Sequence, residues 1–202
     1  TQILFADAIS AAGNHCPQAE QTFFAGRQAF SVPEHFAAHA LKHGLCSGLQ
    51  PRPGESRAIA LFDRLAERLP HLPPDTAIFL ATTVGAIDCL EQAPPTATPD
   101  CPGILLDAVR KRFPQQQATL ISAACASGQI ATACAMRALR RNRCRAALVI
   151  GLDITSEFVT SGFASLGAVS RTIPRPYDEH RDGLLLGEGA GAILLSQESS
   201  RS

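Results

Sequence analysis

The chain has 202 residues, 46% of them apolar, which suffices to bury the core of one large domain or two small ones. Its 18 basic residues balance 18 acidic ones, so the sequence has no electrostatic footprint for nucleic acid or for a membrane surface. The seven cysteines include no CxxC pair, which disfavours a zinc ribbon and favours a reduced, cytoplasmic protein.

The N-terminal part predicts strands and helices separated by irregular chain. In order, we expect a strand over 2–9, a helix over 17–26, irregular chain over 31–54, an amphipathic helix over 56–69 and a buried strand over 77–82. The helix over 56–69 has the clearest pattern, because Phe62, Leu65 and Leu69 share one face and Pro70 follows it.

The C-terminal part continues the alternation of strands and helices. In order, we expect a loop over 92–102, a helix over 104–112, a strand over 118–123, a helix over 127–141, a strand over 146–152 and a strand over 190–195. The strand over 146–152 is a continuous apolar run, typical of strands that are buried on both faces. The pattern predicts an α/β fold with a mixed, mainly parallel sheet covered by helices.

Three histidines recur at helical spacing in EHFAAHALKH, namely His35, His39 and His43. On a helix they would share one face, where they could bind a metal ion. No carboxylate or cysteine completes such a ligand set, so chance spacing is the simpler interpretation and we expect no metal site.

The most informative segment is SAACASGQIATACA, residues 122–135. A predicted strand ends, Cys125 follows, and a predicted helix begins at once. Such a strand–nucleophile–helix turn presents a side chain at a sharp corner that substrate can reach. The positive end of the helix dipole favours a thiolate there, whereas a lone cysteine elsewhere is more often buried and inert.

Three ordered blocks resemble the β-ketoacyl-[acyl-carrier-protein] synthases of the thiolase superfamily. The segment 121–139 is similar to their nucleophile segment, GFASLGAVS (162–170) resembles the loop after the next strand, and RPYDEHRDGLLLGEGAGAILL (175–195) resembles their R-P-F/W-D-x-x-R-D-G signature. Looser similarity extends toward the N-terminus. The resemblance implies that residues 1–202 are the N-terminal half of a thiolase-like fold, and that a C-terminal half lies outside this chain.

The resemblance also implies a reaction. Cys125 would accept an acyl group and condense it with a malonyl thioester after decarboxylation, as in fatty-acid or polyketide-type synthesis. Three alternatives remain open: a non-catalytic partner subunit of the chain-length-factor type, a thiolase-like enzyme acting on coenzyme A thioesters, and a scaffold fragment with no activity of its own. The presence of Cys125 disfavours the partner subunit, and the block over 175–195 fits synthases better than thiolases.

Further expectations follow from the same resemblance. Val84 and Phe163 match positions that line the acyl pocket of the family. We expect no bound cofactor, because the substrates are carried on the phosphopantetheine of an acyl carrier protein. That carrier protein is one expected partner, and a second synthase subunit, in a homodimer or heterodimer, is the other. Five arginines could form a basic patch for the acidic carrier, or simply a solvated helix end: Arg137, Arg140, Arg141, Arg143 and Arg145.

Overall fold

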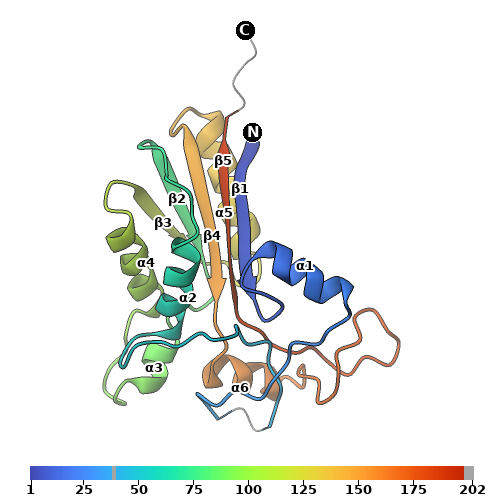
Figure 1. The fold of residues 1–202 in the computed structure, drawn as a ribbon. Coiled ribbons are helices and arrows are strands. Elements are labelled where there is room, and N and C mark those ends of the chain that lie inside the picture. The colour runs from blue at the N-terminus through green and yellow to red at the C-terminus, as the bar shows by residue number, and fades with distance from the viewer. Residues whose placement is uncertain (38–39, 198–202) are drawn as a thin grey trace. The chain divides into compact units, whose positions relative to one another are not determined.

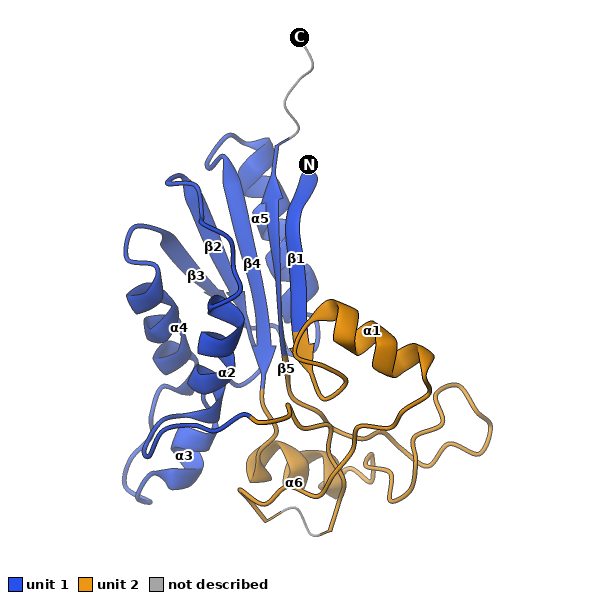
Figure 2. Cartoon of the chain, viewed as in Figure 1, with its two compact units in different colours: residues 1–8, 49–153, 190–202 blue, residues 9–48, 154–189 orange. Residues whose placement is uncertain are grey.

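The computed structural model describes residues 1–37 and 40–197 of the chain. They form two compact units, shown in Figure 2. The first comprises residues 1–8, 49–153 and 190–197, and the second comprises residues 9–37, 40–48 and 154–189. No helix in the described ranges is long and apolar enough to cross a membrane.

A five-stranded sheet organises the first unit, in the order β1-β5-β4-β2-β3. The strands are β1 (Gln2–Ser10), β2 (Thr76–Ala81), β3 (Gln117–Ile121), β4 (Ala146–Asp153) and β5 (Gly189–Ser196). Strand β2 runs parallel to both neighbours, with Ala81 level with Ile121 of β3 and with Gly151 of β4. The carboxyl ends of these three strands therefore lie side by side at one edge of the sheet.

Helices cover both faces of this sheet (Figure 1). Helix α5 (Ser127–Arg140) packs on β2 and β4, while α2 (Arg57–Ala66) contacts β4 and α4 (Cys101–Arg112), which in turn contacts β3. The short helix α3 (Asp88–Gln92) lies between β2 and α4 in the sequence. Strand β4 is buried along most of its length, as its apolar run predicts.

Helix α5 buries a single stripe of small side chains. The buried residues recur every four positions and are Ser127, Ala131, Ala135 and Leu139. Ala131, Ala135 and Leu139 pack in one cluster with Ala147 and Val149 of β4, while Ile130 on another face of the helix is 42% exposed. Helix α5 therefore buries one face against the sheet, and its remaining residues are partly or fully exposed.

The second unit consists of helices α1 (Cys16–Phe24) and α6 (Glu157–Ser165) with long irregular segments. The imidazole of His43 is fully buried. Its Nδ1 lies 3.1 Å from the carbonyl oxygen of Leu41, and its Nε2 lies 2.9 Å from the hydroxyl of Thr160 in α6. His43 thus ties an irregular segment to α6.

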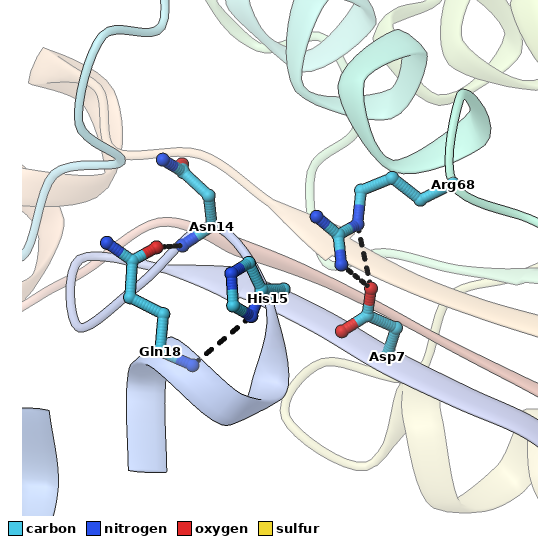
Figure 3. A network of polar contacts seen from close by, with 5 residues as sticks. All are labelled: Asp7, Asn14, His15, Gln18 and Arg68. Carbon is cyan, nitrogen blue, oxygen red and sulfur yellow. Dashed lines mark hydrogen bonds and ion pairs between the residues drawn. The ribbon is translucent and has the colours of Figure 1, made fainter. Parts of the chain in front are cut away.

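Figure 3 shows polar contacts at the start of α1 and just after the end of α2. In the second unit, His15 caps α1 by accepting the backbone N–H of Gln18, and the Gln18 side chain accepts the N–H of Asn14 at 2.8 Å. In the first unit, the Arg68 guanidinium donates to the buried carboxylate of Asp7. Each pair satisfies polar groups near the end of a helix.

Candidate active site

Cys125 lies in a sharp turn between β3 and α5. The N–H of Ala126 donates to the carbonyl of Ala123, and the N–H of Ser127 donates to the carbonyl of Ala124, both at 3.1 Å. Ala124 has φ of 49°, a left-handed conformation that is strained for a residue with a side chain. The Cys125 side chain is exposed. The chain thus presents this thiol at a strained strand-to-helix corner.

The buried hydroxyl of Ser127 holds this corner together. Its oxygen accepts the backbone N–H of Ala123 at 2.8 Å. The hydroxyl lies 2.6 Å from the carbonyl oxygen of Ala124 and 3.3 Å from that of Thr82, so it can donate to either. One side chain therefore fastens the backbone before Cys125 and links it to the end of β2.

Asp153 organises the neighbouring turn at the end of β2. Its Oδ1 accepts the hydroxyl of Thr82 and the backbone N–H of Thr83, both at 2.8 Å. The Thr82 hydroxyl in turn accepts the N–H of Gly85 at 2.8 Å. A single carboxylate at the end of β4 therefore shapes the turn that carries Val84.

The two turns are also joined directly. The hydroxyl of Ser122 donates to the carbonyl of Thr83 at 3.2 Å. Val84, which is half-buried, and Cys125 thus occupy adjacent turns at the same edge of the sheet. Phe163, the other residue matched to an acyl pocket, is half-buried in α6 and belongs to the second unit.

The seven cysteines differ in exposure. Burial is the main cause that raises the pKa values of Cys89, Cys101 and Cys144. Cys46 is buried as well, and Cys134 is half-buried. Cys16, the first residue of α1, is exposed like Cys125. Sequence reasoning did not single out this second accessible thiol.

The charged residues of the segment 175–195 bond to several parts of the second unit. Asp182 accepts the hydroxyl of Ser170 at 2.8 Å, and its pKa is lowered mainly by that hydrogen bond. The Glu188 carboxylate accepts the backbone N–H of Cys46 at 2.7 Å. The Arg181 guanidinium donates to the backbone carbonyl of Asp178. These charges fix separate segments of the second unit.

The histidine segment is not helical where it is described. His35 lies in a bend and His43 in an isolated β-bridge, while His39 lies outside the described residues. The helical face that would have gathered the three imidazoles is therefore not formed by His35 and His43. The five arginines that follow the middle of α5 are all exposed, as the sequence predicts.

Ser127, Thr82 and Asp153 were missed by sequence reasoning. Each is a polar residue at or beyond the carboxyl end of a buried strand, or in the first turn of the helix that follows one. In parallel α/β sheets such ends are where ligands bind. This positional signal was available, although their mutual contacts depend on strand order.

Comparison with known proteins identifies similar chains. Residues 117–201 match the family described as "Beta-ketoacyl synthase, N-terminal domain". A subunit of the phenolphthiocerol/phthiocerol polyketide synthase of Mycobacterium tuberculosis is 30% identical over 148 residues, which are 65% of this chain and 8% of that protein. This chain therefore spans only a small part of that relative.

Solved structures share the fold. The ishigamide ketosynthase/chain length factor matches with a TM-score of 0.81 at 22% identity, over 98% of this chain and 58% of that chain. The ketosynthase ApeO in complex with its chain length factor ApeC, from Xenorhabdus doucetiae, matches with a TM-score of 0.75 at 20% identity, over the same shares of the two chains. The thiolase-like fold expected from the sequence is thus confirmed.

Proposed function

We propose that Cys125 is the acyl-accepting nucleophile of this chain, because residues 117–201 match the β-ketoacyl synthase N-terminal domain and the chain has the fold of about half a ketosynthase. The full protein would be an acyltransferase that condenses the Cys125-bound acyl group with a malonyl group on an acyl carrier protein. The residues 1–202 would be its N-terminal domain, completed by a second half.

The proposed reaction has two stages. The Cys125 thiolate attacks the thioester carbonyl of an acyl group on carrier phosphopantetheine, and the phosphopantetheine thiol leaves as the acyl-cysteine forms. A malonyl thioester then loses carbon dioxide, and its carbanion attacks the acyl-cysteine. The thiolate of Cys125 is released, and the carrier keeps a β-ketoacyl chain that is two carbons longer. The backbone N–H of Cys125 is a candidate donor for the oxyanion of each tetrahedral intermediate.

One observation carries this proposal, the exposed Cys125 in a strained turn that Ser127 fastens through Ala123 and Ala124. A structural cysteine would gain nothing from such a corner, whereas a nucleophile needs both access and a fixed direction. Val84 in the adjacent turn suits an apolar wall for the acyl chain. Phe163 matches an acyl-pocket position of the family by resemblance alone.

A partner subunit without its own activity is the second candidate. Two of the similar structures are assemblies of a ketosynthase with a chain length factor, which supports a paired subunit as partner. A thiolase-like enzyme using coenzyme A thioesters is the third candidate. Acylation of Cys125 would exclude the partner subunit without activity. The choice of acyl donor, coenzyme A or carrier protein, distinguishes the thiolase-like enzyme from a carrier-dependent synthase.

The test uses the full-length protein and acyl groups on either carrier protein or coenzyme A. We expect an acyl adduct on the peptide that contains Cys125 with the carrier substrate, and chain elongation when malonyl-carrier is added. Cys125→Ala should lose both, while Cys16→Ser, which alters the other exposed thiol, should keep both. Acylation that survives in Cys125→Ala would refute the assignment of the nucleophile. Acylation from coenzyme A alone would favour the thiolase-like enzyme.

A further inference from the structure

The connection between β2 and α4 holds two thiols that the proposed reaction does not use. Cys89 lies in the first turn of α3, and Cys101 is the first residue of α4. The N–H of Cys89 donates to the carbonyl of Ala86, and the N–H of Ala86 donates to the carbonyl of Cys101, both at 3.0 Å. Ala86 therefore holds the backbones of the two cysteines together.

The electrostatics of the two thiols agree with this placement. The backbone of Leu90, the residue directly after Cys89, lowers the pKa of the Cys101 thiol. The charge that Cys101 would carry as a thiolate raises the pKa of Cys89, after the larger effects of burial and Asp88. These effects accompany the backbone bonds through Ala86, which bring the two cysteines onto neighbouring segments.

The surrounding backbone is closely packed and keeps this arrangement. Gly85 has φ of 63°, and a Cβ at this position would lie 2.6 Å from the carbonyl oxygen of Cys101. Only a glycine allows the turn after β2 to approach the start of α4 so closely. The two cysteines are therefore held on facing segments by local packing and not by a flexible connection.

We propose that Cys89 and Cys101 are an oxidisable pair that forms an intrachain disulfide, a covalent clamp between α3 and α4 behind the turn of Val84. With oxidised glutathione as oxidant, one cysteine thiolate attacks the glutathione disulfide and releases one glutathione thiolate. The second cysteine thiolate then attacks the mixed disulfide at the protein sulfur and releases the other. The two protein thiols are oxidised by two electrons, and their two protons end on the two reduced glutathione molecules.

The surroundings of the pair set its kinetic character. Burial raises the pKa of both thiols, and the Asp88 carboxylate adds to this effect. Few thiolates are present near neutral pH, so the disulfide forms slowly, and faster as the pH rises. The same high pKa makes each sulfur a poor leaving group, so the disulfide resists exchange once formed. The pair is a slow clamp and not a rapid switch, and it is independent of the chemistry proposed for Cys125.

The sequence allows a direct assay. No lysine or arginine lies between Arg68 and Arg110, so trypsin releases both cysteines in one peptide. Glu91 lies between the two cysteines, so a glutamate-specific protease can then separate them. The full-length protein with Cys16 and Cys125 replaced by serine is equilibrated with oxidised glutathione, alkylated with iodoacetamide and digested with trypsin. We expect this peptide to carry no alkyl group on Cys89 or Cys101. After cleavage at Glu91, its two halves should remain linked until a reductant is added. Cys134 should remain open to alkylation.

Two variants and one condition complete the test. Cys89→Ser and Cys101→Ala should each abolish the joined product, whereas Cys134→Ser should leave it unchanged. Repetition in denaturant separates a native pair from chance proximity in the unfolded chain. The proposal is overturned if the joined product forms only in denaturant, or if Cys89 and Cys101 are recovered only as separate glutathione adducts. The digest of the protein in which only Cys16 and Cys125 are replaced decides this even where Cys89→Ser or Cys101→Ala fails to fold.

Discussion

The seven thiols differ more clearly in their solvent exposure than in the residues that flank them in the sequence. Cys125 and Cys16 are exposed, while burial raises the pKa values of Cys89, Cys101 and Cys144. We expect limiting iodoacetamide on the full-length protein to label Cys125 first, because it is accessible and precedes the longest helix. Peptide mapping measures the order, with Cys16 as the comparison. Preferential labelling of Cys134 or Cys144 would contradict it.

The hydroxyl of Ser127 offers a second test of the turn around Cys125. In Ser127→Ala, the N–H of Ala123 loses its partner in a buried site, which should cost roughly 1–3 kcal/mol of stability. Acylation of Cys125 should slow by more than the loss of folded protein explains, because the thiol would no longer be held in one direction. Denaturant unfolding and acylation rates measure the two effects.

Thr132→Ala is the matched control for Ser127, because its hydroxyl lies in the same helix and bonds only to the Gly128 carbonyl within the exposed turn. It should change stability by less than about 0.5 kcal/mol. Equal effects of the two substitutions would show that the Ser127 hydroxyl has no special part in the turn. Ser127→Thr should restore part of the acylation rate.

Helices were predictable from the sequence where one face of the helix is apolar and buried. Helix α2 buries Leu61, Phe62 and Leu65, and its amphipathic pattern predicted it, although it ends at Ala66, before the expected boundary. Helices α3 and α6 were missed, because α3 has five residues and no buried one, and α6 buries only Thr160. Neither has the apolar stripe on which periodicity depends.

The start of α4 was missed for a different reason. Its first residues belong to a stretch rich in proline that predicted a loop. Pro102 lies in the first turn of the helix, where its missing N–H costs nothing, and Asp100 caps the helix by accepting the N–H of Gly103 at 3.0 Å. An aspartate two residues before a proline was the available signal for this boundary.

His43 provides a pH-dependent tie at the level of elements. Burial lowers its pKa below the ordinary value, so the folded protein holds it neutral. As the pH falls below about 6.5, the unfolded chain binds a proton at this position more readily than the folded one, and stability is lost. We expect the tie between the segment around His43 and α6 to weaken over this range.

The variant His43→Gln should flatten this pH dependence, at some cost in stability at neutral pH. His71→Gln is the control, because His71 is exposed. Hydrogen exchange of the amides of α6 between about pH 7 and pH 5 is the measurement. An unchanged acid response in His43→Gln would assign the effect to other groups.

At the scale of the molecule, local motifs and distant contacts were unequally predictable. The strand, Cys125 and helix are consecutive, so 121–139 alone indicated the turn. The hydrogen bonds among Ser127, Thr82 and Asp153 join residues that are 45 and 71 positions apart. They depend on β2 lying between β3 and β4, an order that no local pattern contains.

The proposed function has a consequence for residues 1–202 expressed alone. We expect them to accept an acyl group on Cys125 and to fail in condensation, because the proposed second half would supply the donors that stabilise the enolate. A radiolabelled acyl-carrier assay, followed by malonyl-carrier addition, measures both steps for the 202-residue chain and for the full-length protein. Elongation by the shorter chain would show that it contains every group the reaction requires.

The loop over 93–100 is a convenient place to attach a handle. It joins α3 to α4, is mostly exposed, and its described backbone includes a hydrogen bond from Ala97 to Pro94. Doubling the length of a flexible loop costs only about 0.6 kcal/mol in closure entropy. An epitope peptide inserted beside Ala97 should therefore leave the sheet intact. It would let the protein be immobilised or labelled through a segment that supplies no group to the chemistry proposed for Cys125.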